Sequence, residues 1–295
     1  MQAQLCDFAV IGGDPRQVFL VEELARPYSR LCYYALCREP EKKRCSPSAS
    51  LTKAASLSEV CQSSRNIVCP IPLSRNGLTL NQNGVAEKLS LSQLLDQFHP
   101  DQHFFAGSIP EDFHAAAQDR GICCHDLMED PALAWFNTLA TAEGAICEAI
   151  IASPVNLHQS HCLILGYGKC GKALAQYLKG MFCHLDILTD DTTEQAQASL
   201  AAHRTGTLSH MERLLPDYDF IFNTVPALIL TASLLEKADP RVTIIDIASA
   251  PGGVDYEAAK KLNLTARSAL GLPGKYSPAS SARGIKTTIE TMLKE

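Results

Sequence analysis

The sequence predicts an α/β protein with two doubly wound parallel-sheet domains. Three observations lead to this fold class. Short apolar runs alternate with amphipathic segments along the chain, and the alternation occurs twice, before and after an apolar helical stretch at residues 141–152. A glycine-rich turn at 166–171 joins a strand-like run to a helix-like one. Strands that alternate with helices are typical of parallel sheets covered by helices on both faces.

The repeated alternation predicts two domains with a boundary between residues 132 and 133. Residues 1–132 would form a flavodoxin-like domain for the substrate. Residues 133–295 would form a linking helix and the second sheet domain, with the final helix (281–295) able to pack back on the first domain. A cleft between two such domains is where we expect the ligand to bind.

Each element is predicted from its apolar pattern and from the turn residues around it. The expected strands are residues 5–13, 30–37, 66–73, 103–107, 121–127, 162–166, 185–188, 219–225, 242–249 and 265–270. Besides 141–152, the expected helices are residues 16–26, 90–98, 110–118, 172–179, 192–200, 211–215, 233–238, 255–262 and 281–295. Residues 38–65 are polar and contain several Ser and Pro residues, so we expect a loop with at most one short helix there.

The bulk composition excludes several classes of function. The net charge of −6 gives no basic surface for nucleic acid or anionic lipid. The N-terminus lacks the basic and apolar regions of an export signal, and no apolar run is long enough to cross a membrane. We therefore expect a cytoplasmic protein.

Cysteine and histidine are scattered along the chain. None of the twelve cysteines forms a C-x-x-C pair, so we expect reduced thiols that serve as small apolar residues. His99 and His103 have the i, i+4 spacing of a helical metal site, but Pro100 lies between them. A loop is the expected structure there, and the sequence predicts no metal.

The glycine turn carries the clearest chemical signal. Gly166, Gly168 and Gly171 match the G-x-G-x-x-G pattern between a strand and a helix. In a Rossmann dinucleotide-binding domain the first glycine allows the tight turn, the second lets the pyrophosphate approach, and the third permits close packing of helix and strand. The helix N-terminus then points its free N–H groups at the phosphates.

The residues between these glycines are also candidates for contact with the cofactor. Tyr167, Lys169 and Cys170 lie within the turn. Lys169 has two interpretations, a phosphate contact or a solvated surface lysine. Cys170 is expected to fill space rather than to act as a nucleophile.

The end of the next strand predicts how the ribose is bound. Asp190 lies 24 residues after Gly166, where a carboxylate accepts hydrogen bonds from the ribose hydroxyls and repels a 2′-phosphate. We favour this role for Asp190 and a helix-capping role for Asp191. The alternative is that both residues cap the helix at 192–200.

Later strand ends contribute to the same edge of the sheet. Asn223, Thr224 and Pro226 follow the strand at 219–225 and are expected on the nicotinamide side of the cofactor. Gly- and Pro-containing turns at 246–255 and 271–278 follow the next two strands. One such turn is unremarkable, but three in succession indicate a pocket.

Several segments together resemble a known family. They are FAVIGGDPRQ, FFAGSIP, TAEGAI, GYGKCGKALAQYLKG, FNTVPA, IDIASAPGGVD and ALGLPGKYSP, between residues 8 and 278. In this order they are similar to the family of dipicolinate synthase A chains. The resemblance implies a fold like that of D-2-hydroxyacid dehydrogenases and an oxidoreductase that uses NAD or NADP.

The same resemblance implies a biological role. The expected reaction is oxidation of dihydrodipicolinate, on a branch of the lysine pathway, in the mother-cell cytoplasm of a sporulating bacterium. The expected partner is the flavoprotein-like second component of dipicolinate synthase, its B chain, and a homo-oligomer is also expected. Relatives often have an Ala-Arg type of ending on the second cofactor-domain strand, which suits NADP. This chain has Thr189, Asp190 and Asp191, so we favour NAD.

The two substrate carboxylates need cationic or hydrogen-bonding partners. Arg16, Arg75 and Lys275 follow strand ends and are the candidates. For each, the alternative is a solvent-facing side chain. Thr141 is expected as a helix N-cap that also donates to the substrate, and Glu143, in the first helical turn, as a proton acceptor. Gly144 beside them indicates a close approach by backbone or ligand.

Two other functions remain compatible with the sequence. One is a dehydrogenase for another small carboxylate, although no histidine follows His210 to supply the acid–base group that 2-hydroxyacid dehydrogenases bring from late in the chain. The other is a dinucleotide-binding scaffold that transfers no hydride. The sequence leaves open how the chemistry is divided between the two components.

Overall fold

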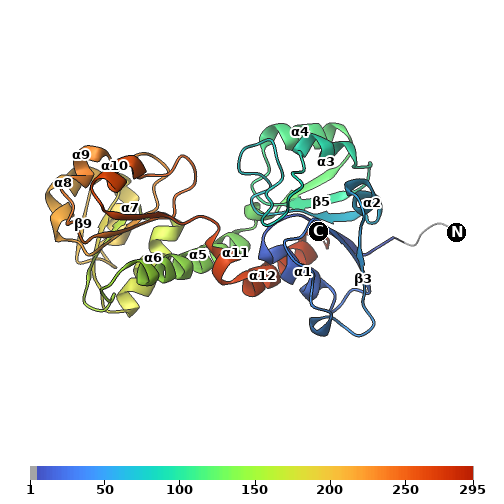
Figure 1. The fold of residues 1–295 in the computed structure, drawn as a ribbon, viewed down its shortest axis with the longest axis horizontal. Helices are drawn as coiled ribbons and strands as arrows, with labels where there is room; N and C mark the ends of the chain where they lie inside the picture. The colour runs from blue at the N-terminus through green and yellow to red at the C-terminus, as the bar shows by residue number, and fades with distance from the viewer. Residues whose placement is uncertain (1–4, 295) are drawn as a thin grey trace. The chain divides into compact units, whose positions relative to one another are not determined.

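The structure is a computed structural model that describes residues 5–294. It divides into two compact units, one of residues up to Phe136 together with those from Ser277 onward, the other of Asn137–Tyr276. Each unit contains one parallel six-stranded sheet flanked by helices (Figure 1). The predicted fold class is confirmed. The division falls inside helix α5 (Pro131–Ala152), a few residues after the predicted boundary.

The sheet of the first unit has the strand order β3-β2-β1-β4-β5-β6, with every neighbouring pair parallel. Its strands are β1 (Phe8–Ile11), β2 (Arg30–Tyr34), β3 (Ser50–Lys53), β4 (Asn66–Val68), β5 (His103–Ala106) and β6 (Cys123–Asp126). The sequence did not predict β3, because this edge strand is largely exposed and lacks an apolar pattern.

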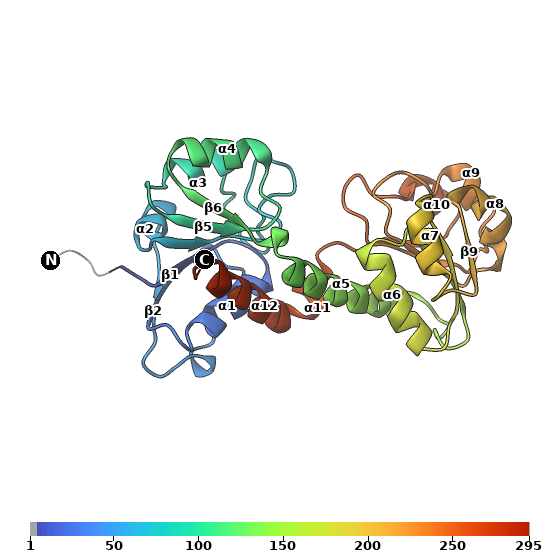
Figure 2. The ribbon, with the colours of Figure 1, turned by 180° about the vertical axis from the view of Figure 1, so that it is seen from behind.

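Helices cover both faces of this first sheet (Figure 1, Figure 2). One face packs under α2 (Leu57–Gln62), α3 (Leu91–Asp96) and α4 (Glu111–Asp119). The other face packs under α1 (Pro15–Leu24) and α12 (Pro278–Met292). The last helix begins three residues before its predicted start, with Pro278 in its first turn, where the missing N–H costs nothing.

The sheet of the second unit has the order β12-β11-β10-β7-β8-β9 and is also parallel throughout. Its strands are β7 (His161–Leu165), β8 (His184–Leu188), β9 (Arg204–Gly206), β10 (Phe220–Asn223), β11 (Thr243–Asp246) and β12 (Thr265–Ser268). Counted from the first strand of each unit, both sheets have the order 3-2-1-4-5-6 typical of dinucleotide-binding folds. The three-residue edge strand β9 was not predicted.

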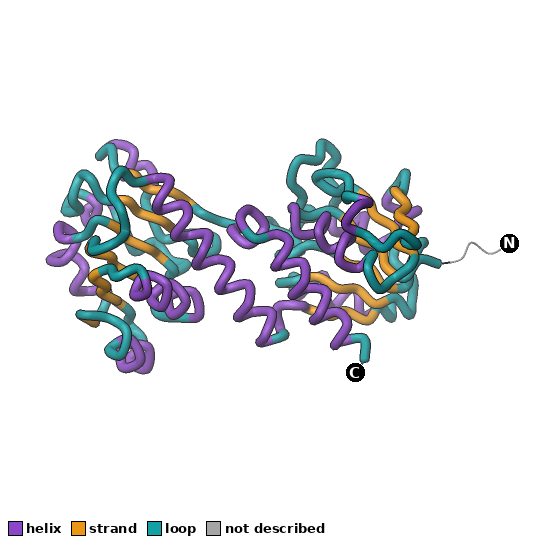
Figure 3. Tube along the Cα trace, turned by 90° about the horizontal axis from the view of Figure 1, so that it is seen from below, coloured by secondary structure: helices purple, strands orange, loops and turns teal. Residues whose placement is uncertain are grey.

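Helices also flank the sheet of the second unit, as the purple and orange segments of Figure 3 show. Residues of α5 and α6 (Lys169–Gly180) pack on one face, and those of α8 (Met211–Leu214), α9 (Ala232–Leu235) and α10 (Tyr256–Lys261) on the other. The remaining helices are α7 (Thr192–Ala198), α11 (Leu272–Tyr276) and the 3-10 turns η1 (Lys42–Arg44), η2 (Leu127–Glu129), η3 (Leu208–His210) and η4 (Leu215–Asp217). Among the described residues, no helix is both long and apolar enough to cross a membrane.

Candidate functional site

The glycine turn has the geometry that the sequence predicts. Gly166 follows β7 with φ of +84°, in the left-handed region that favours glycine. A Cβ there would lie 2.5 Å from the Thr224 hydroxyl oxygen. A Cβ at Gly171 would overlap the carbonyl oxygen of Gly166, so only glycine lets α6 pack this closely on the strand end.

Gly168 differs from the other two glycines because a Cβ there would make no close contact. The nearest neighbour of a Cβ there would be Glu194 Oε1, at 3.7 Å. Gly168 is the N-cap of α6 and makes no side-chain capping bond, so the first-turn N–H groups of this twelve-residue helix remain open to a ligand. A bare main chain followed by a helix N-terminus fits a dinucleotide pyrophosphate.

Glu194 is a residue of this site that the sequence pattern did not reveal. Its Oε2 accepts a hydrogen bond from the Tyr167 N–H at 3.1 Å and another from the Thr189 hydroxyl at 2.7 Å. A carboxylate thus sits at the mouth of the glycine turn. The only signal in the sequence is an acidic residue in the first turn of the following helix, which by itself indicates ordinary helix capping.

The two aspartates after β8 have separate partners. Asp191 caps α7 by accepting a hydrogen bond from Glu194 N at 2.8 Å, which confirms its predicted role. Asp190 is exposed, and its Oδ1 accepts from the backbone N–H of Leu208 at 2.9 Å. Its contact with the ribose stays a prediction.

The other side chains of the turn are packed differently from one another. Tyr167 is buried, Lys169 is exposed, and Cys170 is half-buried. Burial raises the pKa of the Cys170 thiol, which keeps it protonated and unreactive. This agrees with its expected role as a space-filling residue.

The strand ends beside the turn are tied together by buried polar groups. The Asn223 side chain donates to Asp246 Oδ1 at 2.8 Å and to the Val225 carbonyl at 3.1 Å. Asp246 also accepts from Gly253 N and from the Tyr256 hydroxyl, each at 2.9 Å. Asn223 and Asp246 therefore hold two loops of this edge in place, with their polar atoms already paired.

Thr224 and Pro226 lie in the first of these loops. The Thr224 hydroxyl donates to the carbonyl oxygen of Leu165 at 2.9 Å, directly against Gly166. Thr224 is half-buried and Pro226 is exposed. The structure thus brings Thr224 to the glycine turn, while a nicotinamide contact by either residue stays a prediction.

The predicted helix position of Thr141 and Glu143 is wrong. Helix α5 begins at Pro131, so both residues lie mid-helix and neither is in a first turn. The Thr141 hydroxyl donates to the Asn137 carbonyl at 2.8 Å, and Glu143 accepts from the Tyr177 hydroxyl at 3.0 Å. The apolar pattern of 131–140 was too weak to show that the helix starts earlier.

Gly144 shows the close approach that was expected. A Cβ there would lie 2.7 Å from Leu272 Cβ, so the glycine lets α11 pack on α5. Lys275, on α11, is paired with Glu148 of α5, which also accepts from the Tyr276 hydroxyl at 2.8 Å. Lys275 therefore anchors α11 to α5, and its substrate contact stays a prediction.

Arg16 is not a solvent-facing side chain, so that alternative is wrong. Only 3% of the residue is exposed, and its guanidinium pairs with Asp14 at 2.7 Å and donates to the Ile71 carbonyl. Arg75 follows β4 and donates from Nε to Asn81 Oδ1 at 3.3 Å. No other bond of the Arg75 guanidinium occurs among the described residues.

The two halves of the chain match two different family models. Residues 7–128 match the model of the N-terminal domain of the dipicolinate synthase A chain. Residues 141–258 match the NAD binding domain of D-isomer specific 2-hydroxyacid dehydrogenases. The second half thus carries an NAD-binding domain of the dehydrogenase type, which indicates an oxidoreductase.

Known proteins resemble the chain in sequence and in fold. The dipicolinate synthase A chain of Bacillus subtilis (strain 168) is 27% identical over 169 residues, so the match spans little more than half of either protein, 57% of each. The crystal structure of the dipicolinate synthase A chain from Bacillus halodurans has a TM-score of 0.82 at 22% identity, covering 99% of this chain and 100% of that one. The crystal structure of the Bacillus subtilis protein gives 0.79 at 22% identity, with 99% and 97% covered. The two structural matches show the shared fold, and with the family model they confirm the resemblance to the dipicolinate synthase A chain.

Proposed function

We propose that this protein, a relative of the dipicolinate synthase A chain, oxidises dihydrodipicolinate to dipicolinate with a nicotinamide dinucleotide. One observation carries the proposal. An open glycine turn with an uncapped helix N-terminus lies in an NAD-binding domain, and that domain follows a domain of the type that begins the dipicolinate synthase A chain.

The proposed reaction removes one hydride and one proton from the dihydropyridine ring. A bound nicotinamide would accept the hydride, and the proton would leave to solvent or to a nearby base. Because the product is aromatic, the protein has mainly to position the ring, and a strong base is unnecessary. The absence of any histidine after His210 fits this chemistry better than oxidation of a 2-hydroxy acid.

Of the three candidate carboxylate-binding residues, Arg75 is the one whose charged group has the fewest partners within the protein. Arg16 is engaged by Asp14 and Ile71, and Lys275 by Glu148. Arg75 uses only Nε in its bond to Asn81. Its two terminal amino groups have the fork geometry that binds a carboxylate through two hydrogen bonds.

NAD is the proposed cofactor in preference to NADP. Asp190, Asp191 and Glu194 follow β8, where the ribose 2′ position of a bound dinucleotide is expected. Three carboxylates there would repel a 2′-phosphate. Of these carboxylates, Glu194 is the one that accepts a hydrogen bond from the glycine turn, from the Tyr167 N–H.

The wider biological setting is part of the same proposal. The partner is the flavoprotein-like B chain of dipicolinate synthase, and the protein itself forms a homo-oligomer. The place of action is the mother-cell cytoplasm of a sporulating bacterium, on a branch of the lysine pathway. These statements rest on the resemblance given above.

A spectrophotometric activity assay tests the proposal. The purified protein, alone and with the flavoprotein-like partner of the same organism, is mixed with dihydrodipicolinate and either NAD or NADP, and the absorbance of the reduced nicotinamide is followed. Reduction of NAD with formation of dipicolinate is the expected result. Activity only with 2-hydroxy acids would indicate a dehydrogenase for another carboxylate, and tight NAD binding without turnover under any condition would indicate a scaffold.

A further inference from the structure

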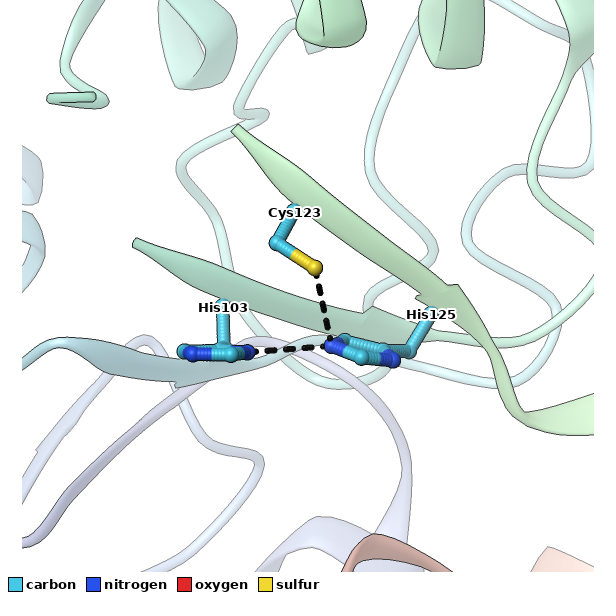
Figure 4. Close-up of side chains that lie close together, drawn as sticks. All are labelled: His103, Cys123 and His125. Atoms are coloured by element: carbon cyan, nitrogen blue, oxygen red, sulfur yellow. Dashed lines mark hydrogen bonds between the residues drawn. The ribbon is translucent and has the colours of Figure 1, made fainter. Parts of the chain in front are cut away.

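Three side chains with nitrogen and sulfur ligand atoms lie together in the first unit (Figure 4). His103 is the first residue of β5, Cys123 is the first residue of β6, and His125 lies two residues further on. The parallel register places His103 opposite Cys123 and Phe105 opposite His125, which brings the three side chains to one face of the sheet. The strand expected at 103–107 is confirmed and begins at His103, and residues 99–102 before it form the expected loop.

This cluster is separate from the proposed redox chemistry. Two of its residues, His103 and Cys123, begin β5 and β6, whereas ligands of parallel sheets bind at the carboxyl ends. His99, the spacing partner considered from the sequence, is not part of it. Sequence spacing could not reveal the cluster, because His103 and the other two residues meet only through strand pairing.

Two of the three distances within the cluster are close to those of a tetrahedral metal site. His103 Nδ1 lies 3.1 Å from His125 Nε2, and Cys123 Sγ lies 3.4 Å from the same nitrogen. All three ligand atoms lie within 4.8 Å of one another. Tetrahedral zinc, with its usual bond lengths, needs about 3.4 Å between two nitrogens and about 3.6 Å between nitrogen and sulfur. The two shorter separations need shifts of a few tenths of an ångström. His103 Nδ1 and Cys123 Sγ lie within 4.8 Å of each other and would have to approach by up to about 1.2 Å, through side-chain rotation, for the ion to bind.

Aromatic packing orients the imidazole ring of His125. The buried ring of Phe105 stacks on His125 at 4.6 Å between centroids and lies at 6.3 Å from the ring of His103. Cys123 is exposed, so solvent reaches the sulfur side of the cluster. Two oriented ligands and one accessible thiol leave an open position for a fourth, external ligand.

We propose that His103, Cys123 and His125 bind one Zn²⁺ ion, with water as the fourth ligand. Two imidazoles and a thiolate are borderline to soft donors, which suit Zn²⁺ and disfavour Mg²⁺ or Ca²⁺. On binding, the Cys123 thiol releases its proton to solvent and the sulfur forms the metal bond. The ion connects β5 to the edge strand β6 and thereby stabilises the folded first unit by mass action.

Metal titration of the full chain tests this site. The chain is stripped with chelator, kept reduced with a phosphine, and titrated with Co²⁺ and Zn²⁺. We expect one equivalent of Co²⁺ with a thiolate-to-metal charge-transfer band, displacement by Zn²⁺, and a higher melting temperature with Zn²⁺. Cys123→Ser and His125→Gln should weaken binding by at least about 100-fold, because losing a ligand costs more than losing an outer-shell partner.

The neighbouring cysteine provides a matched control. Cys124 packs against the core on the other face of the sheet, so Cys124→Ser should keep the band and the affinity. A wild-type chain that binds well below one equivalent would overturn the proposal. So would equal affinity in Cys123→Ser and in the wild type, or a loss that follows Cys124 instead.

Discussion

The first strand of each unit is followed by a glycine turn, yet the two turns are built differently. Both strands, β1 and β7, occupy the same position in sheets of the same order. After β1, Gly13 has φ of +90°, and a Cβ there would overlap the Gln17 side chain. After β7, a Cβ at Gly168 would have only the ordinary contact with Glu194 Oε1 at 3.7 Å.

The helices that follow these turns show the same contrast. Helix α1 is capped by Asp14, which accepts from the Arg16 N–H and binds the Arg16 guanidinium. Helix α6 has a glycine N-cap and no side-chain capping bond. Topology alone therefore does not make a phosphate site. The first-turn N–H groups of the helix must also lack a side-chain cap. Of the two glycine turns, the one in the second unit meets this condition, although Glu194 accepts from the Tyr167 N–H just before the helix.

The largest effect is expected from an anion placed at the second turn. Gly168→Asp should weaken NAD binding by at least about 100-fold, because the new carboxylate repels the pyrophosphate and caps α6 itself. The backbone of Gly168 (φ −65°, ψ −165°) accepts a side chain without strain, so the variant should fold. Calorimetric titration measures the affinity.

Gly180→Asp is the matched control for this change. It adds the same charge at the other end of α6, where a Cβ meets nothing within 4 Å. NAD affinity should stay close to wild type. Equal losses in the two variants would show that net charge, and not the turn, governs binding.

The next effect concerns the first turn and should appear in stability alone. Arg16→Leu leaves the buried Asp14 carboxylate without its partner, which should lower the free energy of unfolding by about 3 kcal/mol. Denaturant unfolding measures the loss, and the double variant Asp14→Asn/Arg16→Leu should recover part of it. A large change in NAD affinity for the folded Arg16→Leu chain would contradict the distinction between the two turns.

A smaller effect should appear in the choice of dinucleotide. Removing the charge of Glu194 by substitution with Gln should raise the NADP-to-NAD affinity ratio by about 10-fold. This factor corresponds to about 1.4 kcal/mol, which lies within the roughly 1 to 4 kcal/mol between two unit charges 4 Å apart near a protein surface. Asp190→Asn, whose carboxylate is bonded to Leu208 N, should change the ratio less. A larger change for Asp190→Asn than for Glu194→Gln would indicate that Asp190 contacts the ribose, as the sequence predicts.

The smallest effect is a pH dependence of stability in the second unit. Hydrogen bonds from Lys275 and from Tyr276, together with the nearby positive charges, lower the pKa of Glu148 below its usual value of 4.5. Its stabilising contribution is therefore present above pH 4.5 and is lost as the pH falls through the lower folded-state pKa. The free energy of unfolding of Glu148→Gln and of the wild type is measured between pH 6 and 3, a range of roughly three units around the ordinary carboxyl pKa. The variant should show the weaker dependence on pH. An equal dependence of the unfolding free energy on pH in the two proteins would contradict this.

The sequence predicted the parts of the fold that have local signals. Buried strands such as β7 and β10 have continuous apolar runs. The turn at Gly166 has the glycine spacing that close packing of strand, turn and helix requires. The edge strands β3 and β9 were missed because they are short and mostly polar. The early start of α5 was missed because its first turns are partly exposed.

The side-chain partners of the candidate site were less predictable. The packing of separate elements decides that Arg16 is buried beside Asp14. It also decides that Glu194 reaches the Tyr167 N–H. Nothing in the local pattern distinguishes a buried arginine from a surface one in the first turn of a helix. The same holds for the cluster of His103, Cys123 and His125, which strand register alone creates.

A crystal structure of the chain with NAD tests the distinction between the two turns most directly. The account predicts the pyrophosphate against residues 166–171, bonded to the first-turn N–H groups of α6, with Glu194 moved off the Tyr167 N–H or turned to the ribose. The turn at residues 12–17 should remain closed by its own side chains. A dinucleotide bound at 12–17, or a glycine turn of the second unit left empty at saturating NAD, would contradict it.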